Sequence, residues 1–229
     1  MRSISRVLLS WSSGKDSAWT LRVLRVQGWH VGALLTTINE TAGRVAMHAV
    51  RVELLEAQAK AAGVPLSRVP IPYPCSNEIY EQRLGEAVRR AAAEGFTHAA
   101  FGDLFLEDVR KYREERLAGS GLAPLFPLWQ QPTAALAETM IAGGLKAIVT
   151  CVDPRVVDRS FVLRAFDRPL LDSLPPGVDP CGERGEFHTF AYDGPMFREP
   201  IAIDRGEVVE RDGFVFGDLL PPQATVTQA

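Results

Sequence analysis

The first half of the chain alternates short apolar runs with longer segments of helical spacing, and this alternation limits the fold more than any other feature. Strands are predicted at residues 7–11, 29–38, 66–71 and 97–101, and helices at 18–24, 47–62 and 77–94. Neighbouring parallel strands need helical connections of this length, whereas hairpins need only a few residues. We therefore expect an α/β fold with a doubly wound parallel sheet that carries helices on both faces.

The first predicted strand ends in a turn of six small or charged residues, namely Ser12, Ser13, Gly14, Lys15, Asp16 and Ser17. Backbone N–H groups at the start of a helix attract anions, Gly14 allows a close approach and Lys15 adds positive charge. Asp16 would repel a bare phosphate, so we expect it to hold a metal ion, Mg²⁺, that bridges it to phosphates. The turn is not a Walker motif, because Leu9 stands where that motif has glycine. An ordinary strand-to-helix turn is the alternative.

Two other segments are expected near this turn. Gly102 and Asp103 follow the fourth strand, so they lie at the same edge of a parallel sheet, where ligands bind. Asp103 could reach a metal, a ribose or a substrate amine, or it could cap the next helix. His48 opens the second helix and is a candidate nucleotide contact, although a partly exposed histidine at a helix start is an equal alternative.

The composition shifts near residue 119, which predicts a nucleotide-binding domain at residues 1–120 and a smaller mixed domain at residues 121–229. Helices are expected at 107–118, 133–142 and 154–163, a strand at 145–152, and loops at 167–180. Short strands are expected at 187–192, 201–203, 208–211 and 213–216, with a frayed tail from residue 221. The helix at 107–118 has the charge pattern of a solvated face, although Arg110 or Arg113 could point back to the cleft.

Residues 181–190 (Cys-Gly-Glu-Arg-Gly-Glu-Phe-His-Thr-Phe) place two carboxylates and a histidine just before a predicted strand. Glu183 and Glu186 could orient an amine nucleophile, take its proton or bind a second metal. A hairpin turn with both carboxylates in solvent is an equal alternative on chemistry alone. Cys181 as a nucleophile would need a base, and His188 lies seven residues further on, so a Cys–His pair is a weaker hypothesis.

Composition excludes several classes of function. A net charge of −3 and a pI near 5.9 give no general affinity for nucleic acid or anionic membranes, and no apolar run is long enough to span a bilayer. The chain starts without the pattern of a signal peptide. Its three cysteines, Cys75, Cys151 and Cys181, are odd in number and widely spaced, which favours a reducing cytoplasm over a disulfide framework or a zinc site.

The turn at residues 12–17 resembles the Ser-Gly-Gly-X-Asp-Ser pyrophosphate loop of the N-type ATP pyrophosphatases (PP-loop enzymes), with Ser13 in place of the first glycine. Further segments look like the diphthine–ammonia ligase (diphthamide synthase) family: residues 47–48 with 53–58, 102–114, 122–129, and 182–189 with 193–195. The resemblance implies a Rossmann-like PP-loop fold and cleavage of ATP between the α- and β-phosphates. In this family ammonia then attacks an adenylated carboxylate, the carboxyl of a modified histidine on elongation factor 2 in hosts that make diphthamide.

We therefore expect an AMP-forming amide ligase that uses ATP, Mg²⁺, ammonia and a carboxylate acceptor. Lys15, Asp16, Glu183 and Glu186 are the expected catalytic residues, and Ser12 to Ser17, His48, Gly102 and Asp103 the expected nucleotide contacts. A PP-loop enzyme of tRNA modification and a non-catalytic nucleotide-binding module are the alternatives. A tRNA-modifying enzyme is expected to carry paired cysteines or a basic RNA-binding extension. A nucleotide-binding module would need neither Asp16 nor the two glutamates. The sequence leaves open a homodimer.

Overall fold

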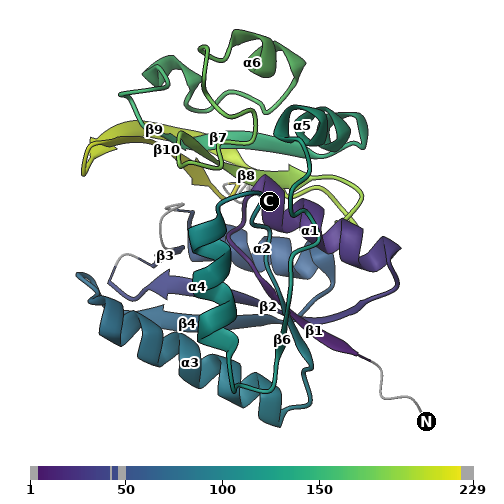
Figure 1. Cartoon of the computed structure of the whole chain (residues 1–229). Helices are drawn as coiled ribbons and strands as arrows, with labels where there is room; N and C mark the ends of the chain where they lie inside the picture. Colours follow the sequence, from purple (N-terminus) through teal and green to yellow (C-terminus); the bar gives the residue numbers. More distant parts are fainter. Residues whose placement is uncertain (1–4, 42, 46–49, 223–229) are drawn as a thin grey trace, which may run out of the picture.

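The structure, a computed structural model, describes residues 5–41, 43–45 and 50–222. His48 lies outside the described residues, so its nucleotide contact stays a prediction. Two β-sheets lie one above the other, with helices between them and on their outer faces (Figure 1). The first sheet comes from residues 6–125 and the second from residues 146–220. The predicted domain boundary at residue 120 stays a prediction.

Five parallel strands form the body of the first sheet, in the order β4-β2-β1-β5-β6. Their bounds are β1 Arg6–Ser10, β2 His30–Asn39, β4 Leu66–Ile71, β5 His98–Ala100 and β6 Ala123–Leu125, and a short β3, Arg44–Val45, pairs antiparallel with the end of β2. The chain runs outward from β1 to β4 and then returns to the other side of β1. Strand order thus reverses between β1 and β5, the place where doubly wound sheets bind ligands. The predicted fold class is confirmed.

Helices cover both faces of this sheet, as its first strand requires. Val7 and Leu9 belong to the core that contains α1 (Lys15–Val26) and α2 (Val52–Ala62), whereas Leu8 belongs to the core on the other face. Successive side chains of a strand point to opposite faces, so both faces of β1 must be covered. The second face is covered by α3 (Asn77–Ala93) and α4 (Glu107–Leu117) (Figure 1).

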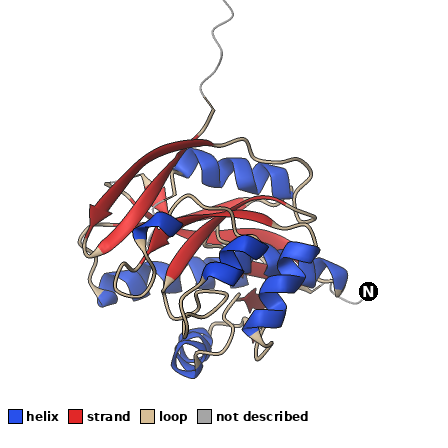
Figure 2. Cartoon of the chain, turned by 90° about the horizontal axis from the view of Figure 1, so that it is seen from above, coloured by secondary structure: helices blue, strands red, loops and turns tan. Residues whose placement is uncertain are grey.

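The second sheet is antiparallel, in the order β8-β7-β10-β9. Its strands are β7 Lys146–Val152, β8 Phe187–Asp193, β9 Asp204–Arg211 and β10 Phe214–Leu220. Buried residues of α5 (Thr133–Ala142) and α6 (Arg168–Ser173) join the same core as β7 and β8. That core also contains α1 and α2, which lie between the two sheets (Figure 1). Seen from above, the strands lie in the middle of the molecule with helices around them (Figure 2). The two halves therefore share one continuous hydrophobic core.

Three of the predicted elements are wrong. Residues 154–163 form turns and a short 3-10 helix, Arg159–Phe161, because Asp153 and Asp158 accept hydrogen bonds from backbone N–H groups two residues ahead. Residues 167–180 contain α6, whose start is capped by Asp167, the acceptor for the N–H of Leu170. Residues 201–203 lie outside any strand, since β9 begins at Asp204. The sequence pattern also gave no strand at β6, where Pro124 is tolerated because β6 is an edge strand.

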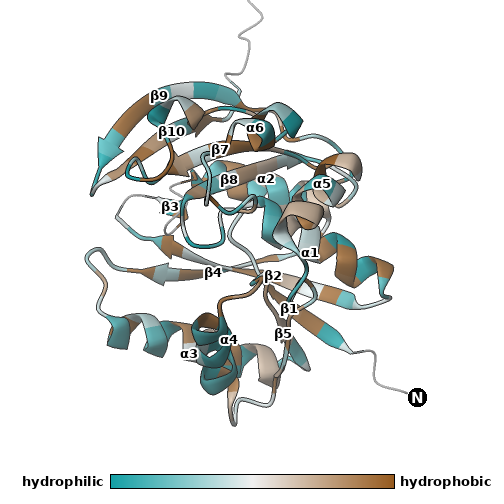
Figure 3. Cartoon of the chain, turned by 45° about the horizontal axis from the view of Figure 1, so that its top comes forward, coloured by the Kyte–Doolittle hydropathy of each residue, from teal (hydrophilic) through white to brown (hydrophobic). Residues whose placement is uncertain are grey.

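The helix α4 presents polar residues to solvent. α4 is almost wholly hydrophilic (Figure 3), in keeping with its i,i+4 ion pairs between Arg110 and Glu114 and between Lys111 and Glu115. Among the described residues, no helix is both long enough and apolar enough to cross a membrane.

Candidate active site at the β1–α1 loop

The loop between β1 and α1 holds a backbone conformation that favours glycine. Ser13 has φ of 70°, in the left-handed region that L-residues with a side chain rarely adopt. Its side chain is fully buried, and its Oγ has no hydrogen-bond partner among the described residues. The Ser13 carbonyl accepts hydrogen bonds from Gln58 Nε2 at 2.9 Å and from the Ala191 N–H at 3.0 Å. The loop is therefore held from α2 and from β8 at once.

The first turn of α1 presents backbone amides at this edge. Ser12 Oγ accepts a hydrogen bond from the Gly14 N–H at 3.3 Å, and Thr189 Oγ1 on β8 accepts one from the Lys15 N–H at 3.1 Å. The amides of Asp16 and Ser17 follow, and helix geometry provides them with no carbonyl in their own helix. The start of α1 thus has the free amides that an anion site needs, and anion binding there stays a prediction.

Lys15 lies under the second half of the chain rather than in open solvent. Its ammonium donates hydrogen bonds to Asp16 Oδ2 at 2.8 Å and to the Cys181 carbonyl, and it lies 5.5 Å from the rings of both Phe166 and Phe187. Burial alone would lower the pKa of Lys15, but the charges of Asp16 and Glu183 contribute to an opposing effect that raises it. Lys15 thus stays charged and joins the loop to residues 179–186.

Asp16 and Asp103 face each other's charge from α1 and from the end of β5. Burial raises the pKa of both carboxyls, and the charge of Asp16 raises that of Asp103 further. Asp16 Oδ1 and Asp103 Oδ2 are buried and have no hydrogen-bond partner in the part of the chain that the structure describes. Arg113 on α4 makes a long ion pair with Asp103, Nε to Oδ2 at 3.5 Å, so Arg113 does point back to the cleft.

Gly102 brings these two segments together. A Cβ at this position would lie 3.1 Å from the Asp16 carbonyl carbon and 3.1 Å from Thr20 Oγ1. A side chain here would push the end of β5 away from the first turn of α1 by a few tenths of an ångström, so glycine favours this close packing. Gly102 is therefore a packing residue of the site.

Glu183 completes the group of carboxylates. Its Oε1 accepts a hydrogen bond from the Leu104 N–H at 2.7 Å, which attaches the 179–186 loop to the segment after β5. Burial is the main cause that raises the pKa of Glu183, to about 7, and the charges of Asp16 and Asp103 raise it as well. A carboxyl with a pKa near neutrality can exchange protons with a substrate at physiological pH.

Glu186 points into its own loop instead. Its Oε1 accepts from the Asp179 N–H at 3.0 Å and its Oε2 from the Arg184 N–H at 2.9 Å. Asp179, in turn, accepts hydrogen bonds from the N–H groups of Cys181 and Glu183 and from Thr133 Oγ1. The two predicted glutamates are thus separated, with Glu183 beside Asp16 and Glu186 inside the turn that positions it.

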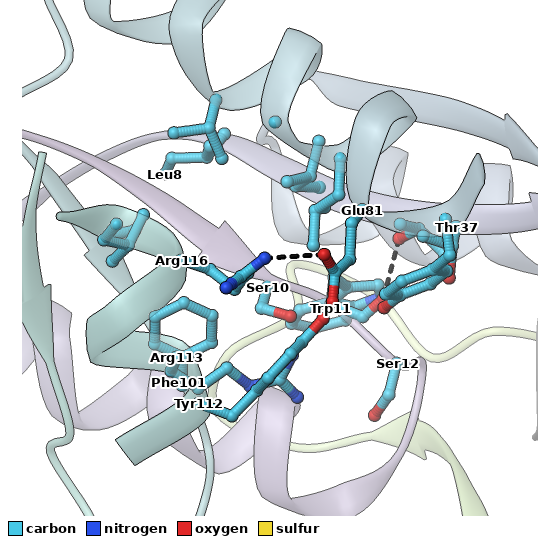
Figure 4. A pocket seen from close by; sticks show the side chains of 18 of the residues that line it. Leu8, Ser10, Trp11, Ser12, Thr37, Glu81, Phe101, Tyr112, Arg113 and Arg116 are labelled. Carbon is cyan, nitrogen blue, oxygen red and sulfur yellow. Dashed lines mark hydrogen bonds and ion pairs between the residues drawn. The ribbon is translucent and has the colours of Figure 1, made fainter. Parts of the chain in front are cut away.

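A cavity of about 420 Å³, here the β1–β2 cavity, opens beside the loop (Figure 4). Its walls combine the ends of β1 and β2 with the facing sides of α3 and α4. Aromatic and basic side chains border it: Trp11, Tyr80, Phe101, Tyr112, Arg89, Arg113 and Arg116. Arg116 is paired with Glu81 at 2.6 Å, whereas Arg113 lies between this cavity and Asp103. The cavity has the size and the lining of a small-ligand pocket.

The sequence interpretation missed three residues that hold the site, although two left a signal. Gln58 is polar yet lies on the apolar side of α2, between Leu54 and Ala62, where it is fully buried. Asp179 precedes a proline, a pair typical of turns that an aspartate side chain organises. Thr189 is buried on β8, two residues from Phe187 and two from Ala191, and therefore lies on the same face of the strand. The sequence carries no other signal for it.

The carboxylates fit a magnesium ion. Mg²⁺ commonly takes one or two carboxylates and fills its other positions with phosphate oxygens and water. Asp16 Oδ1 and Asp103 Oδ2 are two such oxygens without hydrogen-bond partners. The described residues contain no cluster of three or more ligands for a metal site built from protein alone. A metal here would depend on a phosphate ligand.

Comparison with known proteins matches both halves of the chain to one family. Residues 5–123 match the diphthamide synthase N-terminal domain, and residues 132–216 match the diphthamide synthase C-terminal domain. Relatives called diphthine–ammonia ligase include one from Bos taurus, 26% identical over 92% of this chain and 87% of the relative, and one from Mus musculus, 27% identical over 92% and 87%. Another, from Danio rerio, is 28% identical over 86% of each chain. The resemblance seen in the sequence is confirmed.

Proposed function

Because the chain belongs to the diphthamide synthase family, we propose that it is an ATP-dependent ligase that joins ammonia to a carboxylate through an acyl-adenylate. The observation that carries the proposal is the convergence of Asp16, Asp103 and Glu183 beside the start of α1, between two strands where the sheet order reverses. This arrangement offers an anion site, a metal site and a proton acceptor within one cleft.

ATP is proposed to lie across this edge. The β- and γ-phosphates would bind the amides at the start of α1, where the helix dipole favours negative charge. The base and ribose would occupy the β1–β2 cavity, whose aromatic and guanidinium groups suit a planar base. Asp16 and Asp103 would hold Mg²⁺ through Oδ1 and Oδ2, which have no hydrogen-bond partner among the described residues, and the long ion pair of Asp103 with Arg113 would open. When bound, this ion would neutralise the charge of the leaving pyrophosphate.

The reaction would have two steps. In the first, a carboxylate oxygen attacks the α-phosphorus, forming an O–P bond while the bond to the β-phosphate oxygen breaks and pyrophosphate leaves. In the second, the nitrogen of ammonia attacks the acyl carbon and AMP departs. Glu183 would take the proton from the attacking nitrogen, since its pKa of about 7 allows it to be ionised at the start of this step.

Lys15 has a positioning role in this proposal. Its ammonium is enclosed by the Cys181 carbonyl, Asp16 and two aromatic rings, so it orients Asp16 and holds the 179–186 loop against α1. Glu186 supports the same loop from within, through the N–H groups of Asp179 and Arg184.

The test uses Asp16→Asn with ATP, Mg²⁺, ammonium and elongation factor 2 that carries diphthine, the substrate that the relatives' name specifies. We expect wild-type protein to release AMP and pyrophosphate, and the rate of AMP release by Asp16→Asn to be at least about a hundredfold lower. Asp108→Asn, on the exposed side of α4, is the matched control and should keep wild-type rates. ADP as the product, or full AMP release by Asp16→Asn, would contradict the proposal.

A further inference from the structure

A second cavity of about 450 Å³, here the hairpin cavity, lies between the two sheets and is not used by the steps above. One wall is the end of β4 with the residues that follow it, and the other is the β9–β10 hairpin with part of β7 and β8. Its lining is mainly apolar and includes three aromatic residues: Tyr73, Phe214 and Phe216. Tyr73 stands at the mouth, 64% exposed, with its hydroxyl 3.5 Å from Asp212 Oδ2 on the hairpin.

Two arginines line this cavity, and they differ in their carboxylate partners. Arg44 Nη1 makes an ion pair of 2.8 Å with Asp218, a partner that it shares with Arg51. Arg211 lies over the ring of Phe216, 5.0 Å from its centroid, and its ion pair with Asp212 is 3.7 Å long between two largely exposed side chains. Such a pair contributes little, so the Arg211 guanidinium is available to a carboxylate that enters the cavity.

The inner end of the cavity is polar but uncharged. His188 and Cys151 lie opposite each other on β8 and β7, and both line the cavity. Burial lowers the pKa of His188 to about 4 and raises that of Cys151 to about 12, so both side chains are neutral at pH 7. The charges of Asp153 and Arg211 act on Cys151 in opposite directions, and Asp212 also lines the cavity. The Arg211 guanidinium, held only by a long and exposed ion pair, is therefore the group on the hairpin that an anionic ligand would bind.

The hairpin cavity also adjoins the nucleotide loop. Val45 lines both this cavity and the β1–β2 cavity. His188 precedes Thr189, whose hydroxyl accepts the hydrogen bond from the Lys15 N–H. Val45 therefore adjoins both cavities, and β8 connects the hairpin cavity to the start of α1 through the neighbouring residues His188 and Thr189.

We propose that the hairpin cavity binds the carboxylate substrate, with Arg211 as the counter-charge and Tyr73, Phe214 and Phe216 around a planar apolar body. Its role as the acceptor site rests on the proposed ligase function, whereas carboxylate binding itself does not. Arg211 is then a specificity residue on the hairpin, more than 150 residues along the chain from the loop that binds ATP.

The binding test needs no ATP and uses 3-phenylpropionate as the probe, with 3-phenylpropionamide as the uncharged match. Cys75, half-buried in the cavity wall, reports occupancy through its rate of alkylation by N-ethylmaleimide, while Cys151 and Cys181 are buried. We expect the carboxylate to protect Cys75 and the amide to protect it much less. Arg211→Gln should weaken carboxylate binding about tenfold, and Arg205→Gln, exposed on the same strand, should leave it unchanged. Equal protection by both probes, no protection by either, or unchanged affinity in Arg211→Gln would overturn the site.

Catalysis separates this proposal from the ligase function. With ATP and the diphthine-bearing factor, Arg211→Gln should raise the KM for the factor about tenfold while kcat and the KM for ATP stay close to wild type. An unchanged KM for the factor would overturn the acceptor assignment and leave the ligase function intact. Absence of AMP release from wild-type protein, together with Arg211-dependent probe binding, would instead count against the ligase function and uphold the site.

Discussion

Ser13 shows how a single residue can keep a functional backbone at the expense of stability. Its left-handed φ of 70° costs a residue with a side chain about 1 kcal/mol or more, and its buried hydroxyl has no partner among the described residues. The loop keeps this conformation because Gln58 and the Ala191 N–H both bind the Ser13 carbonyl. The family pattern has glycine at this position. Glycine adopts this φ without steric strain, whereas serine does not.

Replacing Ser13 by glycine should therefore stabilise the protein. The relief of strain and of the unpartnered hydroxyl outweighs the added flexibility of the unfolded chain, for a net gain of about 1 kcal/mol and a rise in Tm of about 2–4 °C. Ser13→Ala removes only the hydroxyl and should give a smaller rise. Thermal unfolding followed by circular dichroism checks both. A Tm for Ser13→Gly no higher than that of Ser13→Ala would show that the backbone is not strained.

Glu183 predicts a pH dependence. With a pKa of about 7 it becomes an effective proton acceptor only as pH rises through neutrality, so kcat at constant free ammonia should increase from pH 6 to 8. Glu183→Gln keeps the oxygen that accepts from the Leu104 N–H but cannot take a proton. This variant should lose about a hundredfold in kcat and lose the increase with pH.

The same residue affects stability in the opposite direction. Folding raises the pKa of Glu183 from 4.5 to about 7, so its ionisation favours the unfolded state. The free energy of unfolding is unaffected by this group below pH 4.5 and falls progressively as pH rises to about 7. Glu183→Gln should flatten this part of the stability curve, measured by urea unfolding at pH 4.5 and pH 8. Glu207→Gln, on the exposed side of β9, is the control and should keep the wild-type curves. A kcat profile that is identical in wild type and Glu183→Gln would exclude this residue as the proton acceptor.

Among the elements, the contact between the end of β5 and the first turn of α1 sets the shape of the site. Gly102 touches the backbone of Asp16, and the following residues carry Asp103 and the Leu104 N–H that binds Glu183. The 179–186 loop is attached to the same two elements, by Lys15 on α1 and by Leu104 after β5. Three segments that are distant in sequence are therefore joined into one unit by direct contacts.

Gly102→Ala should disturb this unit. Its Cβ would press on backbone atoms that cannot turn aside, so we expect a loss of about 1–3 kcal/mol in stability and a clear fall in ATP affinity. Gly95→Ala is the matched control, because Gly95 does not line the β1–β2 cavity and its φ of 85° strains an alanine whose Cβ would meet nothing within 4 Å. This variant should lose stability and keep the wild-type affinity for ATP. Calorimetric titration with ATP and urea unfolding measure the two effects. Wild-type ATP affinity in Gly102→Ala would mean that this contact does not shape the nucleotide site.

For the whole molecule, Gln58 is a buried polar link between the two halves of the chain. Its fully buried side chain donates to the Ser13 carbonyl at 2.9 Å and to the Ala191 carbonyl at 2.6 Å, and it accepts from Trp11 Nε1 at 3.0 Å. The surrounding core joins α1 and α2 to β7 and β8. The candidate site thus lies where two halves of the chain meet, and the packing of each half positions the proposed catalytic groups of the other.

Gln58→Met should destabilise the whole protein. The side chain keeps its volume, but Trp11 Nε1 and the Ala191 carbonyl lose their hydrogen bonds to Gln58, and the Ser13 carbonyl keeps only the one from the Ala191 N–H. These losses should cost about 3 kcal/mol. Gln82→Met, exposed on α3, should change stability by no more than about 0.5 kcal/mol. Urea unfolding monitored by Trp fluorescence measures both. A loss of less than 1 kcal/mol in Gln58→Met would show that water replaces the missing partners.

Local patterns predicted the elements whose signals are local. The alternation of apolar runs and helices specified the parallel sheet, and the residue types at 12–17 specified an anion-binding loop, because both depend on neighbours within a few residues. The same reasoning failed where competing local signals were close in strength. The Asp167 cap and Pro169 do favour the start of α6, yet the proline-rich composition of residues 167–180 suggested a loop.

By itself, the sequence determined the fold class, the family and the loop at which a nucleotide would bind. Only the tertiary structure decided what each charged group of the site does. Lys15 faces the Cys181 carbonyl rather than solvent, Glu183 meets Asp16, and Glu186 turns inward to its own loop. The orientations of Lys15 and Glu183 depend on burial and on contacts between segments far apart in the sequence. Such contacts set pKa values and hydrogen bonds, but they produce no periodic pattern in the sequence.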